Sequence, residues 1–129
     1  MIQEKLERIL NEALTRYGAE YGVEPNKIGI LCGLHAGGVY FQVMADMQAK
    51  KFITVTELMN KKIDFTGMAA MIPHFISQKL TGLSEELAIA PEDIKGIIMR
   101  RTDGAYVVQV YNKTKWVKKL DMDEIIGGV

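Results

Sequence analysis

Two residues that could support catalysis or metal binding stand close together in the first half of the chain. Cys32 and His35 form a Cys-x-x-His pair, in which the histidine could act as a base for a thiol nucleophile. A structural zinc site needs four ligands, and His74 is the only further cysteine or histidine in the chain. A small buried thiol beside a loop histidine is the simpler interpretation. We therefore expect no metal, no cofactor and no catalytic residue, and the sequence leans against an enzyme.

Glycines surround the same pair. Gly33, Gly37 and Gly38 flank His35, so their backbone N–H groups could form an anion-binding nest with the imidazole at its rim. No phosphate-loop signature accompanies these glycines, and a tight hairpin loop with positive φ also requires them. His35, Gly37 and Gly38 are therefore a secondary candidate for an anion or ligand site, and a turn is the favoured interpretation.

Basic residues concentrate between residues 97 and 119, where the single acid is Asp103. The six bases are Arg100, Arg101, Lys113, Lys115, Lys118 and Lys119. Tyr111 and Trp116 are interleaved with them, a combination suited to base stacking and phosphate contact. The whole chain, however, has a net charge of zero, and lysines on edge strands also serve to prevent unwanted strand pairing. Nucleic-acid binding is therefore the alternative function.

Alternation along the predicted strands leaves a second set of side chains outside the core. Val39, Phe41 and Val43 share one parity, which places Tyr40 and Met44 on the opposite face of the sheet. With the corresponding aromatic and aliphatic positions of the second half, the candidate protein-binding residues are Tyr40, Met44, Val107, Tyr111 and Trp116. The favoured function is a non-catalytic protein-binding or assembly protein. We expect it to form a homodimer through a sheet edge or an exposed sheet face and to bind another protein.

Helices and strands that position these residues can be read from hydrophobic periodicity. Residues 2–22 and 66–88 are predicted to form amphipathic helices. Residues 28–58 and 94–122 are each predicted to form three short strands joined by tight turns. The third strand of the first set is expected over residues 52–56, where β-branched residues alternate.

Three local features suggest interruptions of this regular pattern. Pro73 predicts either a kink in the second helix or two helical segments, and Ser84, followed by two glutamates, resembles a fresh N-cap. In the last strand Lys118 falls in one every-other-residue series with Trp116, Leu120 and Met122, so a regular strand would point this lysine to the same face as three apolar side chains. Either a bulge intervenes there, or an edge lysine extends its charged end to water.

The two halves of the chain resemble each other at an offset of about 66 residues. Pro25 and Ile28 correspond to Pro91 and Ile94, and the apolar stripes of the two helices correspond at the same offset. We predict an α+β fold of two α-β-β-β units, residues 1–60 and 61–129, with antiparallel meanders and two main helices packed on one face. One continuous sheet and two facing three-stranded sheets both remain possible.

Composition indicates the number of domains, the compartment and whether a membrane helix is present. A chain of 129 residues with 48% apolar and 25% charged residues is typical of one globular domain, residues 1–129. A single cysteine fits a reducing compartment. No apolar run approaches the roughly 20 residues of a membrane helix. We therefore expect a cytoplasmic protein without a membrane partner.

Overall fold

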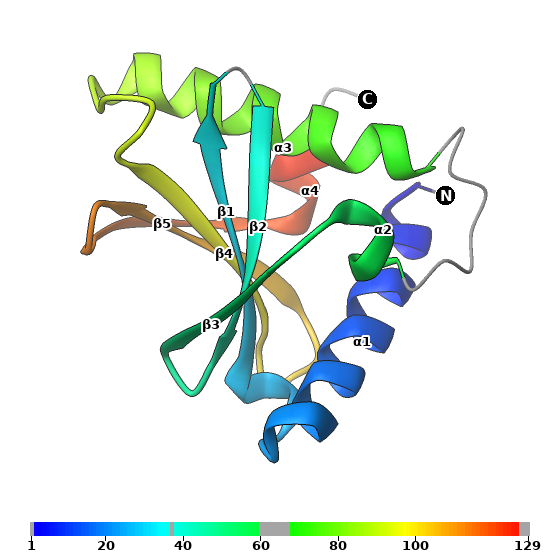
Figure 1. Ribbon diagram of the computed structural model, residues 1–129. Helices are drawn as coiled ribbons and strands as arrows, with labels where there is room; N and C mark the ends of the chain where they lie inside the picture. Colours follow the sequence, from blue (N-terminus) through cyan, green and yellow to red (C-terminus); the bar gives the residue numbers. More distant parts are fainter. Residues whose placement is uncertain (1, 37, 60–67, 127–129) are drawn as a thin grey trace.

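The computed structural model describes residues 2–36, 38–59 and 68–126. Its six strands form one antiparallel sheet in the order β3-β2-β1-β4-β5-β6 (Figure 1). The α+β class is therefore confirmed, and the alternative of two facing sheets is wrong, because β1 pairs directly with β4. The elements are α1 (Ile2–Tyr21), the 3-10 turn η1 (Pro25–Lys27), β1 (Ile28–His35), β2 (Gly38–Ala45), β3 (Gln48–Ile53), α2 (Val55–Leu58), α3 (Met68–Glu86), β4 (Ile94–Arg100), β5 (Tyr106–Asn112), β6 (Lys115–Asp121) and α4 (Met122–Ile126).

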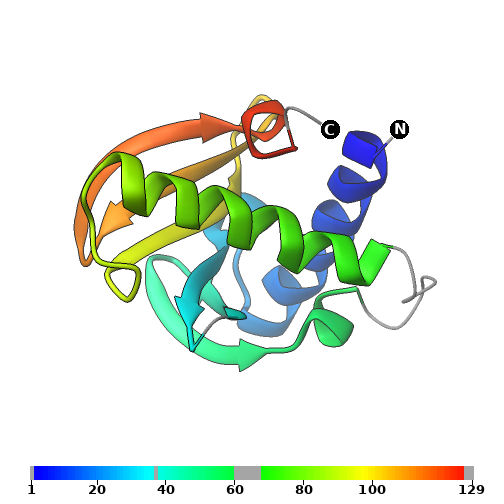
Figure 2. The ribbon, with the colours of Figure 1, turned by 90° about the horizontal axis from the view of Figure 1, so that it is seen from above.

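Helices α1 and α3 cover one face of the sheet. Leu10 and Leu14 of α1 and Leu80 of α3 join one buried cluster with strand residues such as Ile30 and Ile98. In the view of Figure 2 the strands curve around the helices, which lie within the curve. Burial of these side chains supplies the main stabilisation of the fold, because each large aliphatic residue contributes roughly 1.5–3 kcal/mol when fully buried. None of the helices in the part of the chain that the structure describes offers a stretch apolar and long enough to cross a lipid bilayer.

The third strand of the first half ends earlier than the β-branched pattern predicts. The Thr54 hydroxyl accepts a hydrogen bond from the Glu57 backbone N–H, and the Glu57 carboxylate accepts one from the Thr54 N–H, both at 3.1 Å. These two bonds form a capping box that begins helix α2. The expectation of a strand through Thr56 is therefore wrong, because the capping bonds outweigh the β preference of residues 54–56.

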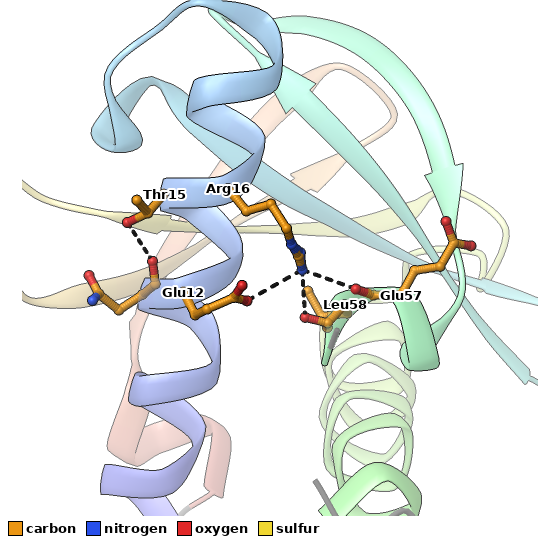
Figure 3. Close-up of polar contacts among 6 residues, drawn as sticks. Glu12, Thr15, Arg16, Glu57 and Leu58 are labelled. Carbon is orange, nitrogen blue, oxygen red and sulfur yellow. Dashed lines mark hydrogen bonds and ion pairs between the residues drawn. The ribbon is translucent and has the colours of Figure 1, made fainter. Parts of the chain in front are cut away.

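Arginine 16 fastens α2 to α1 (Figure 3). Its Nη2 donates hydrogen bonds to the carbonyl oxygens of Glu57, at 3.0 Å, and Leu58, at 3.2 Å, and lies 3.4 Å from a carboxylate oxygen of Glu12. The guanidinium carbon also lies 4.7 Å from the centre of the Tyr17 ring. The carbonyls at the end of α2 are thus satisfied by a charged donor. Because α2 follows β3 directly, Arg16 also holds the end of this edge strand.

Helix α3 runs from Met68 to Glu86 with Pro73 inside it. The two-segment alternative is therefore wrong, and the expected start near Thr66 lies outside the described residues. The prediction that Ser84 caps the start of a new helix is also wrong. The buried hydroxyl of Ser84 donates to the carbonyl of Ile89, beyond the end of the helix, and Ala88 adopts a φ of 55°. The serine therefore helps to end α3, whereas the following glutamates suggested that it begins a helix.

A β-bulge resolves the conflict in the last strand. Val110 pairs with Lys118, whereas the next residue, Tyr111, pairs with Trp116. Val117 is the extra residue, so Trp116 joins Tyr111 on the face away from the helices while Leu120 remains in the core. The bulge is confirmed, and β6 is also an edge strand. At the other end of β5, the expected glycine turn is confirmed by a φ of 91° at Gly104.

Candidate protein-binding face

The face of the sheet turned away from the helices, called the open face below, carries a continuous row of side chains. Paired residues in a sheet point to the same side, so the strand register defines the row. From β3 to β6 its members are Phe52, Gln42, Leu31, Ile97, Gln109 and Lys119. A parallel row holds Tyr40, Gly33, Lys95, Tyr111 and Trp116. The centre of the open face is therefore aliphatic, and aromatic rings stand on both sides.

An aromatic pair occupies the side formed by β2 and β3. A Cβ added to Gly33 would lie 2.4 Å from Cζ of Tyr40, so the tyrosine ring fills the space that a side chain would take. The ring meets Phe52 edge-on, with centroids 5.9 Å apart and planes at 65°. Burial raises the pKa of the Tyr40 hydroxyl. Phe52 is 66% exposed and is held at the surface by this contact.

A second aromatic group occupies the side formed by β5 and β6. The indole Nε1 of Trp116 donates a 2.7 Å hydrogen bond to the side-chain oxygen of Gln109, and Tyr111 is its cross-strand partner. The tryptophan is nevertheless 55% exposed. The hydrogen bond fixes the polar edge of the indole and leaves much of its apolar surface open to contact.

Between these two groups lies a hollow of about 480 Å³. Leu31 and Ile97 form its floor, since both are buried and paired with each other. Its other lining residues are Met44, Met47, Lys95, Tyr111, Lys113 and Thr114. This volume falls within the range of small-ligand sites in proteins. No acidic residue lines the hollow in the described part of the chain.

Four of the five residues predicted for protein binding contribute surface to the open face. Tyr40, Met44, Tyr111 and Trp116 are partly or largely exposed there. Val107 is on the same face but only 2% exposed, so it can support the surface and offers almost no contact area. Phe52 is not among the predicted binding residues, although its alternation with the buried Ile53 could have placed it on this face.

Met47, Leu31 and Ile97 were missed for another reason. Met47 lies in the turn between β2 and β3, where Asp46 and Met47 have φ values of 50° and 67°. Asp46 tolerates positive φ, and a turn between these strands is expected, but methionine is an unusual residue for such a turn, so its type does not place Met47 there. Leu31 and Ile97 become neighbours only through the pairing of β1 with β4, which local periodicity does not reveal.

The six basic residues do not gather on one surface. Arg100 donates a 2.9 Å hydrogen bond to the side-chain oxygen of Asn11, and Arg101 forms a 3.1 Å ion pair with Asp103, both near the turn between β4 and β5. Lys113 and Lys115 lie at the other end of β5, about 20 Å away at the usual rise per residue. Lys118 and Lys119 are adjacent in β6 and point to opposite faces. This dispersal weakens the case for a nucleic-acid track.

The glycine loop joins β1 to β2. His35 and Gly38 pair across the turn, and Ala36 adopts a φ of 47°, whereas Gly37 lies outside the described residues. A hollow of about 270 Å³ beside the loop is lined by His35, Ser77, Thr81 and Glu92, among others. The carboxylate of Glu92 disfavours an anion there, so the geometry favours the tight-turn interpretation of His35 and Gly38.

Cysteine 32 and His35 are separated by the strand that carries them. The thiol is buried among core residues, with Sγ 3.7 Å from the Ile30 carbonyl oxygen, and burial raises its pKa strongly. His35 is exposed at the end of β1, three residues further along, or about 10 Å away at the usual rise per residue. The two side chains therefore cannot act as a nucleophile–base pair. His74 is exposed on α3. Among the residues that the structure describes, no group of three or more histidine, cysteine or carboxylate side chains could hold a metal ion.

Comparisons with known proteins give no family assignment. No protein-family model, no curated protein and no solved structure matches this chain, so the open face itself is the starting point for its function.

Proposed function

We propose that this protein is a non-catalytic binding protein and that the open face is the surface with which it contacts another protein chain. The observation that carries this proposal is the arrangement of two exposed aromatic groups, centred on Phe52 and Trp116, around an apolar hollow. Protein interfaces are enriched in aromatic residues and methionine at their centres. Burial of both rings in a complex would contribute several kcal/mol, at roughly 25 cal/mol per Å² of apolar surface.

The sheet edges are less suited to such contact than the open face. Both edge strands carry lysines, namely Lys50 and Lys51 in β3 and Lys115, Lys118 and Lys119 in β6. Edge-to-edge pairing of two copies would place like charges opposite each other, which is unfavourable. We therefore propose the open face as the contact surface for a different protein, and for a second copy of the chain where the two copies meet through their aromatic groups and not hollow to hollow.

We further propose that the open face is built by two equivalent α-β-β-β units. The arrangement of the elements supports this idea, because each half has a long helix followed by three consecutive strands. The strand order β3-β2-β1-β4-β5-β6 is symmetric about the β1–β4 pair, as it would be for two units related by a twofold axis. Leu31 and Ile97, which are 66 residues apart (97 minus 31), pair within β1 and β4, so the hollow would straddle this axis.

Site-specific photo-crosslinking tests the proposed function. A photo-reactive phenylalanine analogue replaces Phe52 on the open face or, as a matched control, Gln78, which is exposed on helix α3. In cells that naturally make the protein, we expect one or a few identified partners to crosslink at position 52 and not at position 78. Each purified partner should then bind the wild-type chain with fixed stoichiometry and lose binding on Trp116→Glu.

Two results would overturn the proposal. One is equal crosslinking from positions 52 and 78, which would indicate random encounter. The other is a purified complex that Trp116→Glu leaves unchanged, which would place the contact elsewhere. Salt-sensitive retention of the chain on nucleic acid, abolished by Lys115→Glu with Lys118→Glu, would instead support the alternative function. Crosslinking of the chain to itself would identify the second copy as the partner.

A further inference from the structure

We propose that the hollow in the open face binds an acidic peptide segment of a partner protein. In this arrangement a large apolar side chain of the segment rests on Leu31 and Ile97, and a neighbouring carboxylate lies between Lys95 and Lys113. The inference rests on the proposed function, because it specifies the chemistry of the partner at the same face.

The floor of the hollow is suited to an apolar side chain. Leu31 and Ile97 are flanked by Met44 and by the ring of Tyr111. Gly29 contributes no side chain beside them, and a Cβ at that position would lie 2.6 Å from Cγ2 of Ile97. The absence of this atom lets Ile97 occupy the middle of the face. Methionine side chains, such as Met44 and Met47, adapt to the shapes of different apolar groups.

The charge of the hollow favours an anionic partner. Lys95 and Lys113 line it, and neither side chain forms an ion pair or a hydrogen bond with another described residue. Two copies docked hollow to hollow would bring four lysines together without an acid in either lining. A carboxylate of a different protein would pair with both lysines, so charge complementarity favours an acidic partner over a second copy.

A polypeptide fits the surroundings of the hollow better than the other polyanions do. The exposed row continues on both sides of the hollow, to Phe52 in β3 and to Trp116 in β6, so several consecutive residues of an extended segment find contacts. A nucleic acid needs a track of basic residues along its phosphates, and the bases of this chain are dispersed. A free small carboxylate would fill the hollow but leave both aromatic groups exposed.

Amide NMR spectra of the full-length chain test this inference with three synthetic peptides. The probe is acetyl-Asp-Glu-Phe-Leu-Asp-Glu-amide. One control peptide replaces the four acids by lysine, and the other replaces Phe-Leu by Ser-Ser. We expect saturable shifts in the amides of Leu31, Ile97 and Tyr111 with the probe alone. The combined change Lys95→Glu and Lys113→Glu should weaken binding on the order of tenfold, since two ion pairs become two repulsive contacts. Lys115→Glu, at an exposed position on β6, is the matched charge control and should change affinity less than twofold.

Several outcomes would overturn the inference. They are the absence of saturable shifts at millimolar probe, equal binding of the lysine or serine peptide, and unchanged binding after the double charge reversal. Equal affinity for phenylacetate would assign the hollow to a small molecule, and equal shifts with oligothymidylate would assign it to nucleic acid. These failures differ from failure of the proposed function. If a partner crosslinks at position 52 but the chain does not bind the peptide, the open face remains the contact surface and only the acidic segment is ruled out.

Discussion

Replacing Gly33 by alanine should destabilise the protein through one neighbour, Tyr40. The three atoms nearest to a Cβ at Gly33 are Cζ, Cε1 and the hydroxyl oxygen of Tyr40, at 2.4 to 2.6 Å. Ordinary contact begins at 3.4 Å, so the ring must move by about 1 Å (3.4 minus 2.4). The movement disturbs its edge-on contact with Phe52, the contact that presents the phenylalanine on the open face.

Opposing contributions set the size of the effect. Loss of an aromatic pair costs about 0.5–1.5 kcal/mol, and forcing the ring away from its rotamer costs about 0.5–1.5 kcal/mol more. Alanine in the interior of a strand regains about 0.5–1 kcal/mol relative to glycine. The net loss of unfolding free energy is therefore about 1 kcal/mol. In a Tyr40→Ala background the obstacle is absent, and Gly33→Ala should stabilise the chain by about 0.5 kcal/mol.

A double-mutant cycle measures this difference in urea unfolding, followed by circular dichroism. The expected coupling energy between the two positions is about 1.5 kcal/mol, with a change of sign for Gly33→Ala between the two backgrounds. An equal effect of Gly33→Ala with tyrosine or alanine at position 40 would refute the packing of the ring over Gly33.

Four further results are expected. Arg16→Ala should lower the unfolding free energy by about 2 kcal/mol in urea titrations, because two carbonyl groups at the end of α2 lose a charged donor. Thr54→Ala should cost about 1 kcal/mol by the same assay, through loss of the capping box. The buried thiol of Cys32 has a raised pKa and stays protonated in the folded state, whereas in the unfolded chain it ionises near its ordinary value of 9.0. Its contribution is therefore fully present below pH 9 and is lost as pH rises, by about 1.4 kcal/mol per pH unit, and thermal melts of Cys32→Val should show a shallower alkaline decline. Phe52→Ser should lower the unfolding free energy by about 0.5–1.5 kcal/mol, because its edge-on contact with Tyr40 is lost, so its binding is measured where circular dichroism shows the variant folded.

Much of the local architecture could be predicted from residue patterns. The period of apolar residues located α1 and α3, and alternation with a glycine turn located β4 and β5. The same alternation correctly placed Tyr40 and Met44 on the face away from the core. These features depend on interactions within one element or between adjacent strands, where sequence spacing and spatial distance agree.

The remainder depends on contacts between distant residues or on competing local bonds. The hollow exists because Leu31 pairs with Ile97 in the centre of the sheet, and no local pattern encodes that register. Trp116 reaches the open face only through a bulge, which reverses the parity of the rest of β6. At Thr54, two side-chain hydrogen bonds redirect a β-prone segment into a helical turn. The basic residues looked contiguous in the sequence, but the strand geometry separates them.

Fluorescence of Trp116, the single tryptophan of the chain, tests the role of the open face most directly. The free protein should show a solvent-exposed emission spectrum that iodide and acrylamide quench efficiently. Addition of the identified partner should shift the emission to shorter wavelength and protect it from both quenchers, with Gln78→Glu as a variant that behaves like wild type. A stable complex in which Trp116 keeps its emission and its quenching unchanged would contradict the assignment of the contact to this face.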